Sequence, residues 1–178
     1  VKYNVLLTPE SYNTPMGVVK TIRSSLNPVT DIFVCEMGAR NVGDIKEICD
    51  IVHPTHGVIT SIGPQHLESF KTIDNIVKTK FELADSLPKE GLIFLNGDNE
   101  YILKKEGLNN PIYYGIDNPQ ANYRAVDIAV SSKGTEFTII SPDNEKVRFQ
   151  TKLLGRHNVV NIVGAIAVSN TLGIPLED

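Results

Sequence analysis

The sequence lacks the features of a membrane span, a nucleic-acid surface or a disulfide framework. None of its apolar runs approaches the roughly 20 residues that a transmembrane helix requires. With 17 basic and 21 acidic residues the formal net charge is -4, so binding along a DNA or RNA backbone is not expected. The two cysteines, Cys35 and Cys49, are expected to be free buried thiols, as is usual in a reducing cytosol. We therefore expect a cytoplasmic protein with no membrane insertion and no nucleic-acid partner.

A phosphate-binding loop is also missing from the sequence. No stretch fits the pattern G-x-x-x-x-G-K-[ST], whose backbone amides and lysine surround the phosphates of a nucleotide. The nearest approximation, MGVVKT at 16–21, has a glycine and a lysine but neither the required spacing nor a glycine-rich turn. The spacing of the residues therefore does not by itself predict ATP use.

The length and the two ends of the sequence bear on domain organisation. A chain of 178 residues, 41% hydrophobic and 21% charged, has the size and composition of one globular domain. It begins without a methionine inside a strand-like stretch and stops after the turn-forming GIPLED at 173–178. We therefore expect it to be an excised piece of a longer protein.

Strands and helices alternate along the first two thirds of the sequence. Apolar runs predict strands, and apolar residues at helical spacing predict helices. The expected strands are 3–8, 31–36, 56–62, 91–96 and 111–116, and the expected helices are 16–26, 44–52, 72–87 and 99–105. This alternation predicts right-handed βαβ crossovers and an α/β fold with a mostly parallel sheet flanked by helices.

The pattern changes near residue 121. Three segments with alternating apolar residues are separated by the turn formers SKG and PDNE, which predicts an antiparallel β-ribbon over 121–152. A last helix is predicted over 157–172. The fold is therefore expected to end in a different kind of sheet from the one in which it begins.

Polar residues follow the predicted strands, at the end where ligands bind in open α/β sheets. Glu36 ends the second strand, His66 follows the third, and Asn96 and Asp98 follow the fourth. An acid and an imidazole on adjacent strand ends could coordinate a divalent cation that also holds phosphate oxygens. Taken singly, Glu36 could instead be a capping or surface carboxylate, and His66 an ordinary loop histidine.

Lys80 lies within the predicted apolar stripe of the helix over 72–87, whereas Lys78 points to the opposite side. The stripe consists of Ile73, Ile76, Val77, Ala84 and Leu87. A lysine on such a face usually extends its ammonium group outward along its apolar stem. The alternative is a functional amine near the ligand crevice, where desolvation favours the neutral form. The periodicity leaves both interpretations open.

Two asparagines, Asn158 and Asn161, stand near the start of the final predicted helix. Asparagines in such positions can simply cap the helix. Their amides can equally read the edge of a purine, because one side chain offers both a donor and an acceptor.

Six ordered motifs spread over the whole chain resemble the central ATPase domain of the Mur ligases, the ATP-dependent amide-bond-forming enzymes of peptidoglycan precursor synthesis. The motifs are SYNTPMGV, CEMGAR, TSIGPQHLESF, IVKTKFEL, LNGDN and LLGRHNVVN. The resemblance implies a partial central domain over 1–178, without the phosphate-loop strand and helix, the N-terminal UDP-substrate domain or the C-terminal domain. Such a chain should have an exposed edge beside strand 3–8, through which copies could self-associate.

The resemblance implies a metal-dependent catalytic site. Residues at the positions of Glu36 and His66 hold two magnesium ions that bind ATP and the acyl phosphate in this family. The lysine matching Lys80 carries a carbamate that joins the second magnesium. Unmodified, the cationic amine would repel magnesium, and we expect Lys80 to be unmodified in this chain alone.

The resemblance also implies nucleotide contacts. Asn158 and Asn161 match asparagines that contact adenine. Asn96 and Asp98, in LNGDN, are expected near the nucleotide. Asn13 is expected there too, although relatives commonly carry Asn-Asn where this chain has Asn13-Thr14.

The function implied by the resemblance is ligation through an acyl phosphate. ATP would phosphorylate the carboxylate of a UDP-N-acetylmuramoyl-peptide, and D-alanyl-D-alanine, the amine favoured by SYNTPMG and HLESF, would attack it. The alternatives are another amino-acid ligase, of the folylpolyglutamate or cyanophycin synthetase type, and a non-catalytic binding or scaffold module. Without a phosphate loop, the chain alone is expected to lack ligase activity and to bind ATP at millimolar strength or weaker.

Overall fold

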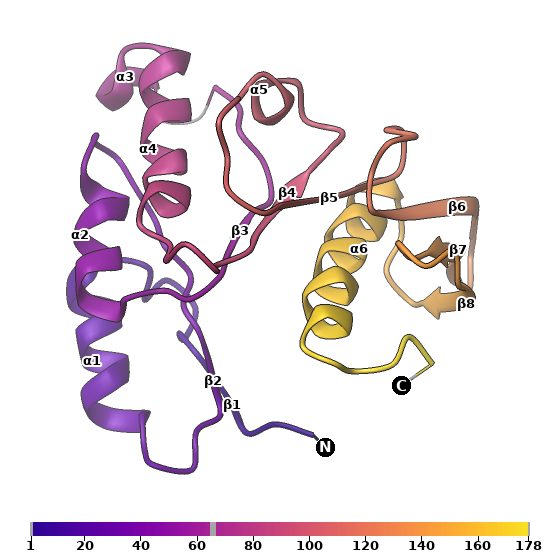
Figure 1. Ribbon diagram of the computed structural model, residues 1–178, viewed down its shortest axis with the longest axis horizontal. Coiled ribbons are helices and arrows are strands. Elements are labelled where there is room, and N and C mark those ends of the chain that lie inside the picture. Colours follow the sequence, from indigo (N-terminus) through magenta and orange to yellow (C-terminus); the bar gives the residue numbers. More distant parts are fainter. Residues whose placement is uncertain (1, 65–66, 178) are drawn as a thin grey trace. The chain divides into compact units, whose positions relative to one another are not determined.

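The computed structural model describes residues 2–64 and 67–177. The chain forms two compact units, which are described separately below. The first unit comprises Val1–Thr55 and Gly63–Pro88, and the second comprises His56–Ile62 and Lys89–Asp178. The elements of both units are labelled in Figure 1.

The first unit combines two short parallel strands with helices. Strands β1 (Val5–Leu7) and β2 (Ile32–Val34) pair in parallel, with Val5 opposite Ile32 and Leu7 opposite Val34. The helices are α1 (Pro15–Ser25), α2 (Asp44–Val52), α3 (Leu67–Phe70) and α4 (Ile73–Asp85). Helix α2 packs against both α1 and α4 (Figure 1). The apolar residues of α2 that recur at helical spacing, Ile45, Ile48 and Cys49, are buried.

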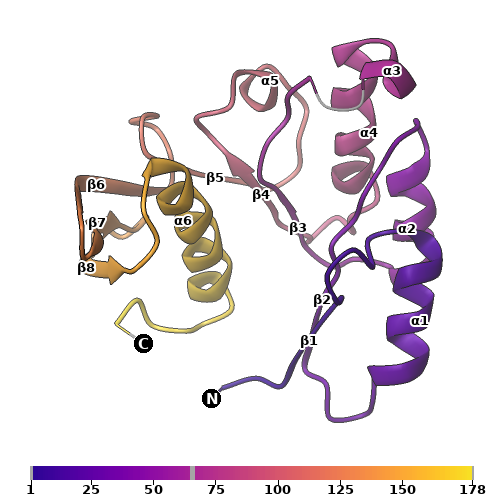
Figure 2. The same cartoon turned by 180° about the vertical axis from the view of Figure 1, so that it is seen from behind.

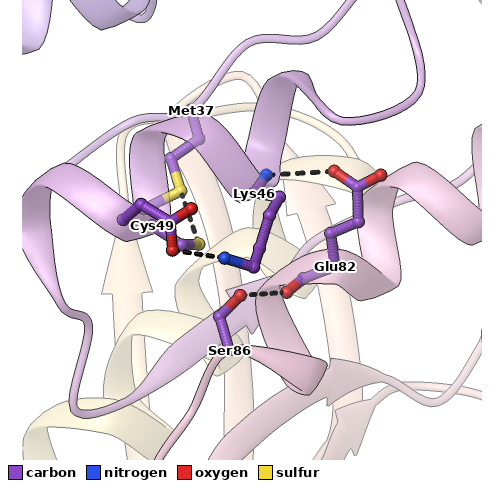
Figure 3. A network of polar contacts seen from close by, with 6 residues as sticks. Met37, Lys46, Cys49, Glu82 and Ser86 are labelled. Atoms are coloured by element: carbon purple, nitrogen blue, oxygen red, sulfur yellow. Dashed lines mark hydrogen bonds and ion pairs between the residues drawn. The ribbon is translucent and has the colours of Figure 1, made fainter.

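A carboxylate on α4 caps the N-terminus of α2. The N-cap residue of α2, Gly43, has no side chain to accept from the first amides of the helix. Glu82 takes this role, because its two oxygens accept from the backbone N–H of Gly43 at 2.7 Å and of Lys46 at 3.0 Å. Figure 3 shows the bond from Lys46. Negative charge at a helix N-terminus also complements the helix dipole. Glu82 therefore ties α4, the helix that carries Lys80, to α2.

The second unit is built on one six-stranded mixed sheet in the order β3-β4-β5-β6-β7-β8. The strands are β3 (Gly57–Ile59), β4 (Ile93–Asn96), β5 (Pro111–Gly115), β6 (Tyr123–Ser131), β7 (Gly134–Ile140) and β8 (Lys146–Thr151). Strands β3 to β6 run parallel, and β6 to β8 pair antiparallel. The short helix α5 (Glu100–Leu103) follows β4, and α6 (Arg156–Thr171) follows β8.

Helix α6 packs on the sheet at β4 to β7, as Figure 2 shows from behind. Its residues Val159, Val163 and Ala167 are fully buried. They join a core that includes Phe94, Tyr114 and Phe137 from three strands. The ring of Phe137 also stacks on Phe149 of β8, at a centroid distance of 5.9 Å. The parallel strands, through Phe94 and Tyr114, and the antiparallel strands, through Phe137, therefore share one core under α6.

The predicted α/β fold, with parallel strands followed by an antiparallel ribbon, is confirmed. One detail differs from the prediction of one mostly parallel sheet: strands β1 and β2 form a separate two-stranded sheet. The antiparallel ribbon continues the six-stranded sheet. Strand β2 also ends at Val34, because the N–H of Glu36 donates to the hydroxyl of Thr8 at 2.9 Å instead of to a strand.

Two further differences concern helices. The segment Leu67–Phe70 forms the helix α3, which the periodicity does not predict. The stripe predicted for α4 holds only in part, because Ile76 is buried together with Thr79 and Phe81, which lie outside it. Within the described residues, no helix combines the length and hydropathy needed to cross a membrane.

Candidate functional site

In the first unit, residues from three segments meet around the carboxylate of Glu36. The amide Nδ2 of Asn13 donates to Oε1 of Glu36 at 3.0 Å, and the N–H of Gly38 donates to the carbonyl of Asn13 at 2.7 Å. Thr8 fixes the backbone of Glu36 from the end of β1. A Cβ at Gly38 would lie 2.9 Å from Cγ of Asn13, so a larger residue here would displace the Asn13 amide from Glu36. The carboxylate is exposed and held at one oxygen.

Lys80 of α4 is half-buried and lies within electrostatic reach of Glu36. Burial lowers the pKa of its amine from the ordinary value of 10.5, and the Glu36 carboxylate opposes this by raising the pKa. Burial is the larger effect. Lys78, two residues away, is exposed as expected. Among the residues predicted for the site, the structure thus places Asn13, Glu36 and Lys80 in one region, and burial there lowers the pKa of the Lys80 amine.

The fit of this cluster to magnesium depends on its oxygen donors. Magnesium keeps several of its waters and takes one or two carboxylates together with phosphate oxygens. Glu36 supplies such a carboxylate, whereas Lys80 could contribute only after carbamylation turned its amine into an anion. His66 lies outside the described residues. Among those that are described, no group of three or more histidine, cysteine, aspartate or glutamate side chains is arranged to hold a metal.

The two cysteines add no nucleophile to this unit. Burial raises the pKa of the Cys35 thiol to about 11, with smaller contributions from Cys49 and Glu36. Burial also raises the pKa of Cys49, whose Sγ lies 3.9 Å from Sδ of Met37 (Figure 3). Both side chains are therefore protonated thiols at neutral pH, and the expectation that they are free is confirmed.

In the second unit, Asn96 at the end of β4 and Asn99 in the loop after it bind the backbone that follows β3. Asn96 donates from Nδ2 to the carbonyl of Thr60 at 2.9 Å, and Asn99 donates to the carbonyl of Ile62 at 2.8 Å. Oδ1 of Asn96 accepts from the N–H of Asp98, and Oδ1 of Asn99 caps α5. The amides of this motif therefore connect neighbouring loops.

Asp98 is bound by the loop that follows β5. Its Oδ2 accepts from the N–H of Ile116 at 2.6 Å, and its Oδ1 accepts from those of Asp117 and Asn118, both at 2.9 Å. A Cβ at Gly115 would lie 2.6 Å from Oδ1 of Asp98, so this position requires glycine. Both carboxylate oxygens thus have backbone donors within the protein.

The start of α6 is joined to the same loop. Arg156 forms an ion pair with Asp117, with a distance of 2.5 Å between Nη2 and Oδ1. Asn158 is half-buried, and its Nδ2 donates to the carbonyl of Leu154 at 2.8 Å. Asn161, one turn further on, is exposed. Asn158, one of the two asparagines predicted to contact adenine, therefore stabilises the turn into the helix in the structure.

Several contacts in the structure are not predicted by the sequence patterns. Glu82 had no recognisable signal, because it caps a helix 36 to 39 residues away. Asp117 and Arg156 are ordinary surface charges in the sequence, 39 positions apart. Gly38 could have been noticed, since it follows the predicted strand 31–36, which ends in Glu36, whereas Gly115 lies inside the predicted strand 111–116.

The fold and this arrangement of strand-end residues define the class. Residues 1–169 match the family model described as the Mur ligase middle domain. The chain belongs to the Mur ligase family through this domain, which confirms the resemblance of the six motifs.

The similar proteins narrow the relationship within the family. The UDP-N-acetylmuramoyl-tripeptide--D-alanyl-D-alanine ligase of Escherichia coli K12 is 30% identical, over 98% of this chain and 39% of its own length. The ligase of the same name from Haemophilus influenzae is 33% identical, over 98% of this chain and 37% of its own. The MurF ligase from Thermotoga maritima, solved in complex with ADP, has a TM-score of 0.87 at 25% identity, over 98% of this chain and 40% of that one. The chain thus spans about two fifths of the length of these relatives.

Proposed function

We propose that this chain is the ATP-dependent part of a ligase that joins D-alanyl-D-alanine to UDP-N-acetylmuramoyl-tripeptide. The terminal carboxylate of the tripeptide substrate would attack the γ-phosphorus of ATP and release ADP. The amine of the dipeptide would then attack the carbonyl carbon of the acyl phosphate, and phosphate would leave as the amine loses a proton. The observation that carries this proposal is the similarity of 98% of the chain to ligases named for that reaction, with Glu36 held at the end of β2.

The residues of the first unit would act on the transferring phosphoryl group. A magnesium ion, when bound, would stabilise the negative charge that develops on the phosphate oxygens. Glu36 would hold it through Oε2, because Oε1 is engaged by Asn13. The lowered pKa of Lys80 supports carbamylation, which requires a neutral amine. We include His66 in this proposal as a second metal ligand on the family resemblance alone.

The residues of the second unit would hold the nucleotide base. Asn161 is exposed and therefore accessible to a purine. The bond from Asn158 to Leu154 uses the amide nitrogen Nδ2 and leaves the amide oxygen Oδ1 for a ligand. The primary amide of asparagine can donate to and accept from a purine edge at once. The phosphates would still need a phosphate-binding loop, so we expect no ligase activity from these 178 residues alone.

The test is a ligase assay on a protein expressed with the coding sequence on either side of these residues. We expect repeated turnovers of ADP release only when UDP-N-acetylmuramoyl-tripeptide and D-alanyl-D-alanine are both present, because without the dipeptide the reaction stops at the acyl phosphate. Replacing the dipeptide by single amino acids, including diaminopimelate, L-alanine and glutamate, tests the other ligase types. Activity with one of these in place of the dipeptide would reassign the substrate. Absence of a phosphate-binding loop in the flanking sequence, together with no ADP release, would favour a non-catalytic module.

A further inference from the structure

A set of hydrogen bonds links the loops at the carboxyl end of the sheet in the second unit. The loop after β4 reaches the loop after β3 through Asn96 and Asn99. It reaches β5 through the N–H of Gly97, which donates to the carbonyl of Tyr114 at 2.7 Å. The loop after β4 is therefore held on both sides by its neighbours.

Asp98 is the member of this set with the most partners. Its two oxygens accept from three consecutive backbone amides, those of residues 116–118. Hydrogen bonds to a charged acceptor are about twice as strong as neutral ones. Three of them on consecutive amides fix the path of the loop far more tightly than a single contact would. The absence of a side chain at Gly115 lets the carboxylate come this close.

The loop in turn contacts the start of α6. Asp117, whose amide is bound by Asp98, pairs through its own carboxylate with Arg156, the first residue of α6. Asn158 stands two residues further on and Asn161 one turn beyond it. A continuous series of contacts therefore runs from Asp98 to the segment that carries both asparagines.

Direct binding of a nucleotide by Asp98 fits these contacts poorly. Its carboxylate would repel the phosphates of a nucleotide, as like charges do at short range. Both of its oxygens already face backbone donors. An interaction with a ligand would have to compete with three bonds that are present in the unliganded protein.

We propose that Asp98 is a positioning residue for the nucleotide site: it fixes the loop 116–118 and, through Asp117 and Arg156, the start of α6. This inference rests on the proposed function, because it takes Asn158 and Asn161 as the residues that bind adenine. It differs from the role that the LNGDN motif suggests, since Asp98 acts on the nucleotide only through the loop.

The test uses the 178-residue protein labelled with ¹⁵N and three single substitutions. Asp98→Asn keeps the shape of the side chain but places an NH₂ group where an oxygen accepts from the backbone. Glu100→Gln is the matched control, because it removes the same charge two residues away, from a side chain whose ion pair is with exposed Lys104. Asp117→Asn breaks the ion pair to Arg156 and leaves Asp98 intact, so it still tests the connection if Asp98→Asn fails to fold.

Two readouts come from the same samples. Amide hydrogen exchange at residues 116–118 reports the loop without ligand. Chemical-shift titrations with ADP and with adenosine, which lacks phosphates, report binding well beyond millimolar dissociation constants through the initial slope of the shift change against ligand concentration. For Asp98→Asn we expect exchange at these amides about 10- to 100-fold faster, the range of a charge-assisted hydrogen bond. We expect the affinities for ADP and for adenosine to fall by the same factor, roughly tenfold. Asp117→Asn should lower both affinities by about twofold, as expected for an exposed ion pair. Glu100→Gln should change neither the affinities nor the exchange rates.

The remaining outcomes overturn the inference in distinguishable ways. Unchanged exchange in Asp98→Asn would show that the carboxylate does not hold the loop. Faster exchange with unchanged affinity would reduce Asp98 to a structural role. Unchanged exchange with weaker ADP but unchanged adenosine binding would show that Asp98 contacts the phosphates directly. If the unsubstituted protein shows no shifts with either ligand, the adenine site of the proposed function fails, and the positioning role fails with it, whatever the exchange rates show about the loop.

Discussion

Glu36 in the first unit and Asp98 in the second occupy similar places in the chain and are used differently. Each follows a parallel strand by two residues. One oxygen of Glu36 accepts from a side-chain amide, and the carboxylate stays exposed. Both oxygens of Asp98 accept from backbone amides. The comparison teaches that an acid at the end of a strand becomes available to a ligand only where the neighbouring loop leaves its oxygens without donors.

The largest expected effect is on kcat, which should fall when Glu36 is replaced but not when Asp98 is replaced. In the ligase expressed with its flanking sequence, Glu36→Gln should lower kcat by about 100- to 1000-fold, the range seen when one preorganised electrostatic partner of a transition state is removed. Asp98→Asn should act mainly on the KM for ATP, because it displaces the adenine site rather than the reacting atoms. Steady-state kinetics at varied ATP concentration would distinguish the two. A comparable loss of kcat in both variants would break the comparison.

For the free energy of unfolding we expect the opposite order, with the larger loss in Asp98→Asn. Asp98→Asn should lower the free energy of unfolding by about 1–2 kcal/mol, because the partly exposed N–H groups of residues 116–118 lose a charged acceptor. Glu36→Gln should stay within about 0.5 kcal/mol, as is usual for an exposed position. Urea denaturation of both variants would check this. Equal destabilisation would mean that Glu36 is as much a structural tie as Asp98.

A smaller effect is expected at Lys80, beside Glu36. Burial disfavours its charged form more than Glu36 favours it, so Lys80→Met should raise the free energy of unfolding by up to about 1 kcal/mol at neutral pH. Such a gain is typical of a residue kept for function rather than stability.

The sign of the pH dependence provides a control for the Lys80 prediction. The folded-state pKa of Lys80 lies below its ordinary value of 10.5, so the unfolded chain binds this proton more strongly. Between the lowered value and 10.5, the stability of the unsubstituted protein should therefore rise with pH, and Lys80→Met should lack that rise. Parallel stability curves for the two proteins over this window would contradict the assignment.

The smallest effect concerns a polar group of the second unit that has no partner. The hydroxyl of Tyr114 is buried in the core, and no hydrogen-bond partner for it exists among the described residues. Burial raises the pKa of this phenol well above its usual value. Tyr114→Phe should therefore be neutral or stabilise the protein by up to about 1 kcal/mol. Destabilisation in a thermal melt would reveal a partner, such as a buried water, and Tyr123→Phe, which loses a 2.7 Å bond to Asn170, provides the contrast.

Residue patterns predicted the elements better than the contacts between them. Helical periodicity correctly distinguished half-buried Lys80 from exposed Lys78. The position of Glu36 after an apolar run was also read correctly, although β2 ends two residues earlier than predicted. The bond from Asn13 to Glu36 spans 23 positions and depends on how two loops meet, which no local pattern encodes.

The role of Asp98 was harder to predict for a different reason. Its partners are backbone amides, which every residue except proline carries, so the sequence gives no sign of them. The separate pairing of β1 with β2 was missed because apolar runs identify strands but not their neighbours. The prediction of self-association beside strand 3–8 is still a prediction, to be checked by sedimentation.

The most direct test of the account is the binding of Mn²⁺, a spectroscopic substitute for magnesium, measured by electron paramagnetic resonance at saturating ADP. The samples are the ligase with its flanking sequence, its Glu36→Gln variant and its Asp98→Asn variant. The account predicts that Glu36→Gln weakens Mn²⁺ binding by about tenfold or more, as expected for the loss of a carboxylate ligand, and that Asp98→Asn leaves it unchanged once ADP is bound. Equal weakening by both substitutions, or none by Glu36→Gln, would contradict it.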